Sequence, residues 1–325
     1  MATDYIMFIH GVNTRYEGII KPYYANELFN SIKNQLGTTR TIKPVVLYWG
    51  EVGAKRDKAL LETLEKSTDW NKLWFRQLRC QTILPFIGDG ALYTTRYEGA
   101  AVVATLAEQA LHDLKDYNPQ VDRLHLVTHS WGTIILFDVL FAERWDDENK
   151  PGYDSVKKIR ENFFGIEPNA GQGLSLASIH TMGSPIALFY RMDVDQSVEE
   201  KKNSQGVVLN SHDITPRLEK LLDSLYKRLG AKLPWRNFIH PGDPLAFPLN
   251  PLLPELVDGR RQFIQIEDIV TKNKTFYDFV TNTFNQTTFS IVHGGKAHYS
   301  YWQSKEIAQK IADVIQQATS HSDPT

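Results

Sequence analysis

The chain has 325 residues and a formal net charge of −2, a length that suits one large α/β domain or two smaller ones. Its basic pairs are scattered and neither end is strongly charged, so the composition argues against a nucleic-acid-binding protein. No apolar run approaches the ~18 residues that a membrane-spanning helix needs.

Cys80 is the only cysteine, so no disulfide can form within the chain, and we expect a small buried apolar residue at this position. The absence of disulfides suits the reducing cytosol. Residues 1–4 lack the basic segment and the long apolar core of a secretory signal. These features together predict a cytoplasmic protein.

Apolar runs alternate along the chain with segments of helical periodicity. The runs predict strands over 5–9, 43–49, 124–127, 178–182, 235–239 and 262–266, and the periodic segments predict helices over 21–36, 98–114, 131–141, 215–229 and 304–318. Glycine and proline residues predict a turn at 88–90 and a polar surface excursion over 143–173. This alternation is typical of a mostly parallel sheet with helices on both faces, so we predict an α/β fold in a single domain, 1–325.

Two segments, about 50–97 and 193–233, interrupt the alternation and are predicted to be helical insertions. Their apolar residues recur at helical spacing, with Trp70, Leu73 and Trp74 in the first and Leu218, Leu221, Leu222, Leu225 and Leu229 in the second. The helix of the second insertion is expected to pack over the sheet. Because both segments leave the sheet at strand ends, we also predict that they form a cap over a pocket, with Trp74 in contact with substrate.

The segment Thr128-His129-Ser130-Trp131-Gly132 joins a predicted strand to a predicted helix. A strand, a sharp turn with a central serine and a helix form the setting of a nucleophile elbow, in which the helix N-terminus favours developing negative charge. The usual pattern is G-x-S-x-G, and Thr128 stands in place of the first glycine. A serine in such a turn also has purely structural explanations, so the assignment of Ser130 as a nucleophile depends on the rest of the chain.

The first predicted strand ends in His10-Gly11, followed by a polar loop that contains Asn13. A glycine at a strand exit allows backbone N–H groups to come close to a reacting oxygen. A tight loop between strand and helix is the alternative interpretation. His10 is expected to support this loop, and Asn13 borders it, where each is a candidate substrate contact.

Three polar residues follow predicted strands in the order Ser130, Asp243, His298. Side chains that carry chemistry in open α/β sheets gather at the carboxyl ends of the strands. A hydroxyl nucleophile needs an imidazole that takes its proton and a carboxylate that orients the imidazole. The order serine, acid, histidine is that of α/β-hydrolases.

Other residues compete for these roles. Asp193 and Asp195 follow the preceding predicted strand and Asp268 follows the next one, so each is an alternative acid, although Asp243 is favoured. His293 is the alternative base to His298, which is favoured by its local pattern. The remaining strand histidines, His125, His129 and His180, are expected in the core or at the sheet edge, and His240 is expected at the mouth of the site.

The strand that ends in His10-Gly11, the elbow around Ser130 and the acid beyond a strand resemble the α/β-hydrolase superfamily. The segment 237–247, Asn-Phe-Ile-His-Pro-Gly-Asp-Pro-Leu-Ala-Phe, resembles the acid loop of intracellular lipases of the phospholipase A1 kind. The segment 297–304, Ala-His-Tyr-Ser-Tyr-Trp-Gln-Ser, resembles the histidine segment of the same enzymes and of bacterial serine esterases. The resemblance implies that the backbone N–H groups of Val12 and Trp131 form an oxyanion hole.

We therefore expect a serine esterase, in which Ser130 attacks the ester carbonyl, His298 transfers the proton and Asp243 orients the imidazole. The resemblance and the apolar insertions favour lipase or phospholipase substrates, and a short-chain ester or a thioester is the second choice. A non-catalytic ligand-binding or partner-docking protein on the same scaffold is the alternative from another class.

No cluster has the spacing of metal ligands, and no glycine-rich nucleotide-binding motif is present, so we predict neither a metal nor a cofactor. The expected partner is a small-molecule or lipid ester, and no nucleic acid. A lipid substrate would bring the protein into transient contact with a membrane surface.

Overall fold

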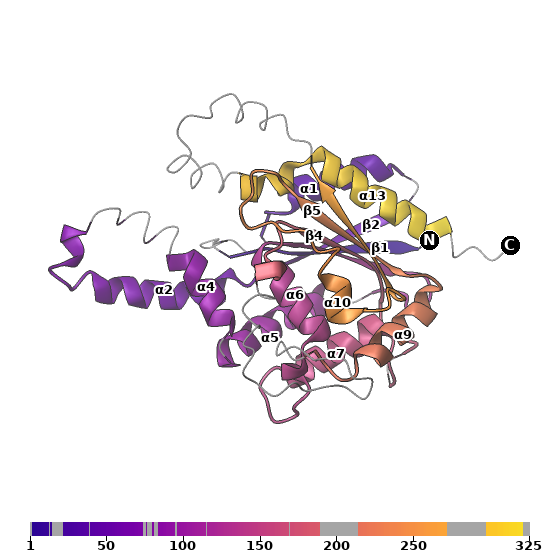
Figure 1. Ribbon diagram of the computed structural model, residues 1–325, viewed down its shortest axis with the longest axis horizontal. Helices are drawn as coiled ribbons and strands as arrows, with labels where there is room; N and C mark the ends of the chain where they lie inside the picture. The colour runs from indigo at the N-terminus through magenta and orange to yellow at the C-terminus, as the bar shows by residue number, and fades with distance from the viewer. Residues whose placement is uncertain are drawn as a thin grey trace.

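Six parallel strands form one sheet at the centre of the molecule (Figure 1). The computed structural model describes residues 2–12, 14, 22–38, 40–73, 76, 80, 84–94, 96–114, 116–168, 170–188, 214–271 and 297–320. The strands are β1 (Thr3–Ile9), β2 (Thr41–Leu47), β3 (Arg123–His129), β4 (Ser175–Met182), β5 (Leu233–Ile239) and β6 (Ile264–Val270). Their order is β2-β1-β3-β4-β5-β6 and each neighbouring pair is parallel. All six predicted strands are confirmed.

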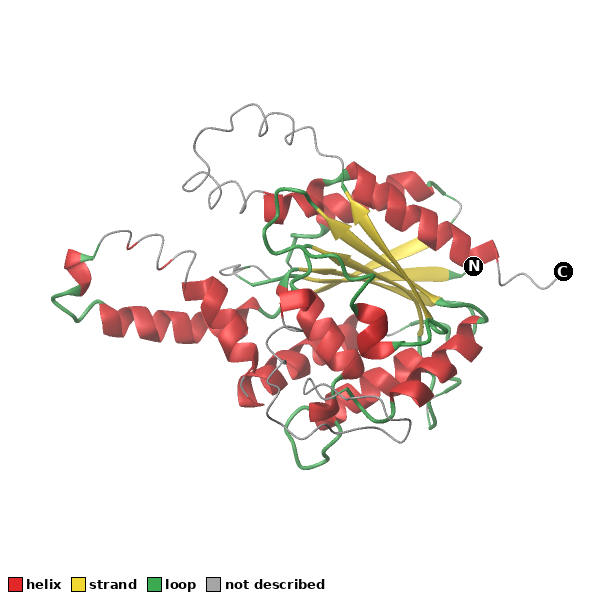
Figure 2. Ribbon diagram, viewed as in Figure 1, coloured by secondary structure: helices red, strands yellow, loops and turns green. Residues whose placement is uncertain are grey.

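Helices flank the sheet on both sides, with η denoting a short 3₁₀ helix. They are α1 (Asn26–Leu36), α2 (Gly50–Leu64), η1 (Trp70–Lys72), α4 (Leu84–Thr94), α5 (Arg96–Asp113), α6 (Trp131–Phe141), η3 (Glu143–Trp145), α7 (Tyr153–Phe164), α9 (Leu218–Leu229), α10 (Leu253–Val257), η4 (Ser300–Gln303) and α13 (Lys305–Ser320). Figure 2 shows helices above and below the central strands. The predicted mostly parallel α/β sheet, covered on both faces, is confirmed.

The two faces of the sheet have separate hydrophobic cores. Buried residues of α1 and α13 pack on one face, against Ile6, Phe8, Val127 and other strand residues that alternate along β1 and β3. Buried residues of α5, α6, α7 and α9 pack on the other face, against the intervening residues of the same strands. Because both faces are covered, the strands read in the sequence as continuous apolar runs, which is why they were predictable.

The segment 143–173 is not the polar surface excursion that the sequence predicts. It contains α7, whose buried residues are Tyr153, Val156, Arg160, Phe163 and Phe164. The first four of these positions recur at spacings of three, four and three, and Phe164 lies four residues after Arg160, so one stripe faces the core although the other faces are polar. The predicted turn at 88–90 is also wrong, because these residues lie within α4.

The described part of the second insertion covers the sheet, as predicted. Leu221, Leu222 and Leu225 of α9 are buried in the core that α9 shares with α7 and β4. This placement differs from the predicted roof over a pocket, because the apolar face of α9 is turned towards the sheet. Cys80 is half-buried, less enclosed than expected.

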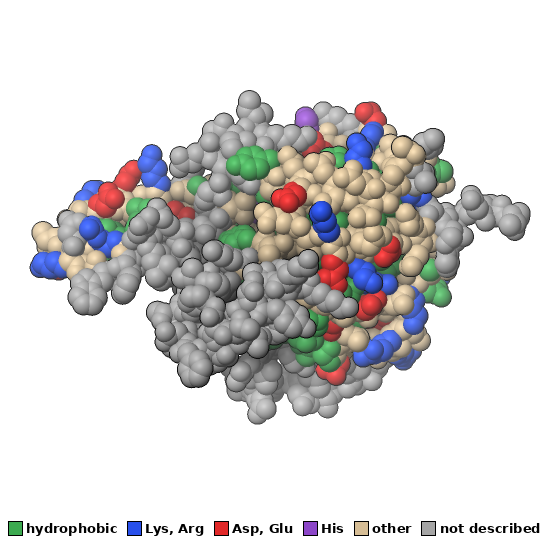
Figure 3. Space-filling model, turned by 90° about the horizontal axis from the view of Figure 1, so that it is seen from above, with side chains coloured by type: hydrophobic (Ala, Val, Ile, Leu, Met, Phe, Trp, Pro, Cys, Tyr) green, Lys and Arg blue, Asp and Glu red, His purple; other side chains and the backbone are tan. Residues whose placement is uncertain are grey.

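The first insertion contains α2, which extends away from the body of the molecule and packs on α4 (Figure 1). Leu60 and Leu73 are exposed in this insertion. Acidic and basic side chains are interspersed over its surface and over the described part of the upper face (Figure 3). In the portion of the chain that the structure describes, no helix is both long enough and apolar enough to span a bilayer.

Candidate active site

Ser130 occupies a strained turn between β3 and α6. Its backbone φ is 53° and ψ is −126°, and a positive φ is uncommon for a residue other than glycine. Three hydrogen bonds hold the turn. The Ser130 N–H donates to the Met182 carbonyl over 2.9 Å, and the N–H and hydroxyl of Thr133 donate to the Ser130 carbonyl over 2.9 and 2.7 Å. The strand–turn–helix context that the sequence predicts for Ser130 is therefore present.

The loop after β1 lies directly against this turn. A Cβ atom at Gly132 would lie 2.6 and 2.7 Å from the carbonyl oxygens of His10 and Ile9, and a Cβ at Gly11 would lie 2.5 Å from the Ser130 Cβ. Such distances are too short for a side chain, so both positions require glycine. Thr128, which stands in place of the first glycine of the usual motif, is still a residue of β3 and is fully buried in the sheet.

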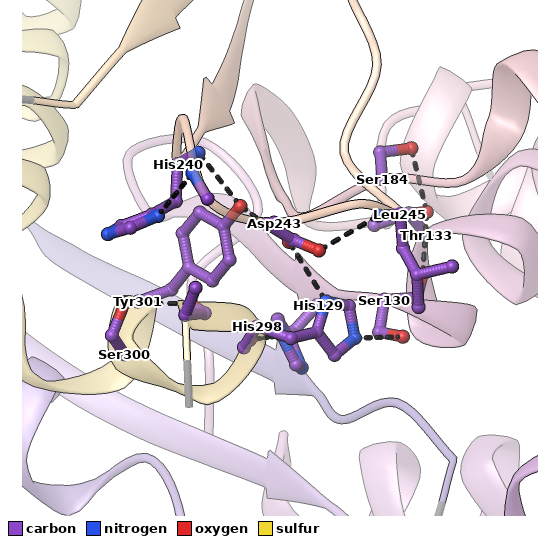
Figure 4. Close-up of polar contacts among 12 residues, drawn as sticks. His129, Ser130, Thr133, Ser184, His240, Asp243, Leu245, His298, Ser300 and Tyr301 are labelled. Carbon is purple, nitrogen blue, oxygen red and sulfur yellow. Dashed lines mark hydrogen bonds and ion pairs between the residues drawn. The ribbon is translucent and has the colours of Figure 1, made fainter. Parts of the chain in front are cut away.

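Ser130, His298 and Asp243 form a continuous hydrogen-bonded relay (Figure 4). His298 Nε2 lies 2.7 Å from Ser130 Oγ, and His298 Nδ1 lies 2.9 Å from Asp243 Oδ2. Since an ionised carboxylate accepts hydrogen bonds only, Nδ1 carries the proton and Nε2 is left to accept the serine hydroxyl proton. The three residues come from the turn after β3, the turn after β5 and the segment before η4.

The Asp243 side chain is buried, yet its surroundings favour the ionised carboxylate. Burial alone would raise the pKa of its carboxyl, but hydrogen bonds and the charge of His298 outweigh burial and lower this pKa. The other hydrogen-bond donors are the Tyr301 hydroxyl, 2.7 Å from Oδ2, and the Leu245 N–H, 3.0 Å from Oδ1. An ionised carboxylate at this position can stabilise an imidazolium on His298.

Three residues that sequence reasoning did not assign to the site contact the relay. His129 Nε2 donates to the carbonyl oxygen of His298 over 2.5 Å, and burial lowers the pKa of His129 well below its usual value, so its ring is neutral. Tyr301 binds the acid. Gly183, with φ of 58°, lies so close that a Cβ would be 2.8 Å from Asp243 Oδ2. Only the position of His129 beside the nucleophile offered a signal in the sequence.

His10 supports the loop after β1 through both ring nitrogens. Nδ1 donates to the Gly11 carbonyl over 2.5 Å, and Nε2 accepts from the Trp49 N–H over 3.1 Å. Trp49 Nε1 donates back to the His10 carbonyl over 3.0 Å, and the two rings are stacked. Val12, in the same loop, is buried, and Trp131 is the first residue of α6. These contacts support a positioning role for His10.

Asp268 is engaged elsewhere. Its carboxylate accepts hydrogen bonds from the Asn237 side chain over 2.7 Å and from the N–H groups of Leu249 and Asn250 over 2.9 and 3.0 Å. It therefore anchors the chain that follows the acid turn. His240, 7% exposed, accepts the Gly242 N–H at Nδ1 within the acid turn. The remaining candidates Asn13, Trp74, Asp193, Asp195 and His293 lie outside the described residues.

A second hydrogen-bonded series of serine, histidine and aspartate side chains lies deep in the sheet. His125 Nε2 is 3.3 Å from Asp4 Oδ1, and His125 Nδ1 is 2.7 Å from Ser178 Oγ, which is also 2.8 Å from His180 Nε2. All four residues are fully buried, as expected for the histidines. Ser178 lies within β4, where backbone N–H groups are used by the sheet, so no oxyanion hole can form beside it. We interpret this chain as structural.

No family model and no curated protein matches the chain. Among solved structures, it is similar to an acetyl xylan esterase (TM-score 0.34, 9% identity, 97% of both chains covered) and to the peroxisomal α/β-hydrolase Lpx1 of Saccharomyces cerevisiae (0.36, 8%, 100% of this chain and 78% of that one). A third is the RedJ thioesterase of Streptomyces coelicolor (0.27, 15%, 91% and 86%).

At these TM-scores the likenesses decide neither the fold nor the chemistry. The fold rests on the structure itself, in which the parallel sheet is covered on both faces and a strand–turn–helix carries Ser130. This is the α/β-hydrolase arrangement predicted from the sequence. Among the residues that the structure describes, no group of histidine, cysteine and carboxylate side chains is placed to hold a metal ion.

The acid is tested by replacing Asp243 and, as controls, the three alternative aspartates. Asp243→Asn keeps the side-chain shape but removes the charge and favours the wrong imidazole tautomer, so hydrolysis of an activated ester should slow by roughly 10⁴-fold. Asp268→Asn, and likewise Asp193→Asn and Asp195→Asn, should stay within about tenfold of the parent protein, a loss of at most 1.4 kcal/mol in activation free energy. The measurement is kcat/KM, with thermal melting to verify folding. If Asp268→Asn, Asp193→Asn or Asp195→Asn is instead the inactive variant, the acid follows another strand.

Proposed function

We propose that this protein is a serine hydrolase that cleaves carboxylic esters through an acyl-enzyme. The observation that carries the proposal is the relay in which Ser130 Oγ, the His298 ring and Asp243 Oδ2 are linked by hydrogen bonds of 2.7 and 2.9 Å. In the first step the Ser130 oxygen attacks the ester carbonyl carbon, and His298 Nε2 takes the hydroxyl proton. His298 then gives this proton to the leaving alcohol.

In the second half-reaction, water replaces the alcohol. His298 Nε2 takes a proton from water as the water oxygen attacks the acyl carbon, and returns a proton to Ser130 Oγ as the acid product leaves. Asp243 stays ionised throughout, because its hydrogen bonds lower its pKa, and it stabilises the imidazolium in both halves.

The tetrahedral intermediates carry negative charge on the former carbonyl oxygen. The candidate donors are the backbone N–H groups of Trp131, at the N-terminus of α6, and of Val12, in the loop that Gly11 holds against Ser130. The contact of Gly11 with Ser130 and the position of Trp131 at the start of α6 support a pair of donors that needs no large movement.

The strained turn favours an enzyme over a binding protein on the same scaffold. A residue other than glycine with positive φ costs roughly 1–3 kcal/mol and persists only where the surrounding structure enforces it. Here three hydrogen bonds enforce it and aim Ser130 Oγ at His298. The intact hydrogen-bonded set of Ser130, His298 and Asp243 supports an enzyme over a ligand-binding or partner-docking protein on this scaffold.

The substrate class rests on the first insertion and on the resemblance to lipases. A Cβ at Gly90 of α4 would lie 2.9 Å from the Trp131 ring, so α4 packs directly beside the nucleophile turn. Leu60 and Leu73 are also exposed, but they lie on the arm formed by α2 and the residues after it, which extends away from the body of the molecule. The contact of α4 with Trp131 and the resemblance to lipases support a cap that offers apolar contacts to an acyl chain, and hence a lipase-like or phospholipase-like ester as the preferred substrate. A short-chain ester or a thioester is the alternative.

Two serines that contact histidines allow a matched test of the nucleophile. Ser130→Ala should abolish labelling by a fluorophosphonate probe and reduce ester hydrolysis by roughly 10³-fold or more, as removal of a triad nucleophile does elsewhere. Ser178→Ala, which removes a buried serine between two histidines, should still be labelled in proportion to its folded fraction. Full labelling of the Ser130→Ala variant would rule out this nucleophile.

The chain-length preference separates a lipase from a small-ester esterase. Each fully buried methylene contributes about 0.8 kcal/mol, so kcat/KM should rise several-fold, and at most ~15-fold, per added pair of carbons until the acyl site is full. The measurement is kcat/KM over p-nitrophenyl esters from acetate to palmitate, repeated with Trp74→Ala, which should flatten the rise. Tyr226→Ala, which removes an exposed aromatic side chain of α9, is the control. A maximum at acetate that Trp74→Ala does not move would contradict the lipid preference.

A further inference from the structure

The Tyr301 side chain is buried beside the relay and joins two of its elements. Its hydroxyl donates to Asp243 Oδ2 over 2.7 Å and accepts the His240 N–H over 2.9 Å (Figure 4). His240 and Asp243 belong to one turn, closed by a hydrogen bond from the Asp243 N–H to the His240 carbonyl. One hydroxyl therefore holds both the backbone and the carboxylate of the acid turn.

The same carboxylate oxygen accepts hydrogen bonds from the base and from Tyr301. Asp243 Oδ2 lies 2.9 Å from His298 Nδ1 and 2.7 Å from the Tyr301 oxygen. His298 and Tyr301 are three residues apart in one short segment. The acid is thus fixed to the segment that carries the base by two bonds, which restrict rotation of the carboxylate about its own axis.

The His298 ring and the Tyr301 hydroxyl also compete for the negative charge on the same acceptor atom, Asp243 Oδ2. A hydroxyl that donates to a carboxylate oxygen withdraws electron density from it, so this oxygen attracts the His298 imidazolium less strongly than a free carboxylate would. Burial and the charge of Asp243 raise the pKa of Tyr301 far above its usual range, so its hydroxyl stays protonated and remains a donor.

Packing leaves the tyrosine ring little freedom to move. A Cβ at Gly183 would lie 3.0 Å from a ring carbon of Tyr301, and the His129 and His240 rings lie 5.6 and 6.4 Å from its centre. The other titratable groups beside the relay include these two histidines, Tyr299, whose ring lies 5.7 Å from that of His298, and His10, whose charge acts on His129. Burial lowers the pKa of both the His129 and the His240 ring, that of His129 strongly, and so favours their neutral forms.

We propose that Tyr301 is a positioning residue that fixes the Asp243 carboxylate and, by sharing its Oδ2 atom with His298, sets the basicity of the catalytic imidazole. This inference rests on the proposed function of Ser130, His298 and Asp243. The Tyr301 hydroxyl contacts the relay at Asp243, so its effect on His298 passes through the acid. A purely structural tyrosine would contribute to stability but would leave the ionisation of His298 unchanged.

The test compares Tyr301→Phe with Tyr93→Phe. Tyr93 is a matched control because it is also buried and also donates to an aspartate, Asp138 Oδ2, over 2.5 Å. The pKa of His298 is read by NMR from the ring protons of labelled histidine, and the acidic limb of kcat/KM is recorded in parallel. Tyr301→Phe should raise both pKa values by roughly half a unit, because Oδ2 then attracts the imidazolium more strongly, and should lower kcat about tenfold. Tyr93→Phe should move neither pKa.

A second variant avoids dependence on the folding of Tyr301→Phe. Replacing Tyr301 by 3,5-difluorotyrosine keeps the ring shape but makes the hydroxyl a stronger donor, so the His298 pKa should fall. Unchanged His298 ionisation in this variant, or a shift in Tyr301→Phe no larger than in Tyr93→Phe, would overturn the inference. The NMR titration needs no turnover. Failure of the wild-type protein to react with a fluorophosphonate would therefore refute the proposed function, while the titration would still decide the role of Tyr301.

Discussion

The candidate site depends on how closely the loop after β1 approaches the turn that carries Ser130. Neither Gly11 nor Gly132 has room for a Cβ atom, because the nearest atoms would lie between 2.5 and 2.7 Å away. The backbone of the loop therefore lies beside Ser130, whose φ is 53°. Two hydrogen bonds between His10 and Trp49 hold this loop in place. A substitution at either glycine would separate the two parts of the proposed oxyanion hole.

The parallel sheet brings the remaining groups to the same place. The ends of β3, β4 and β5 supply Ser130, Gly183 and the Asp243 turn, and the last part of the chain supplies His298 just before α13. The buried chain from Asp4 through His125 to Ser178 shows that residue types alone do not make a site. Its serine lies within a strand, without a strained turn and without spare backbone donors, whereas Ser130 lies where a strand ends and a helix begins.

Much of this arrangement could be predicted from the sequence, and the exceptions have physical reasons. The strands were predictable because burial on both faces makes them continuous apolar runs. The α7 helix was missed because its buried stripe contains Arg160 and is hidden among polar residues. For α9, the amphipathic pattern predicts that one face is buried but does not specify what buries it. The contacts of Tyr301 and Gly183 with the relay depend on tertiary distances, which have no signature in local spacing.

Transfer of a group to the nucleophile tests the central proposal most directly. An aryl carbamate passes its carbamoyl group to an activated serine, and the product hydrolyses slowly enough to be isolated. Treatment with p-nitrophenyl dimethylcarbamate, followed by peptide mapping by mass spectrometry, should find one carbamoyl group per chain, located on Ser130, with one equivalent of p-nitrophenol released. His298→Ala should lose this reaction. A carbamoyl group on a different residue, or none while ester hydrolysis continues, would contradict the assignment of Ser130 as the nucleophile.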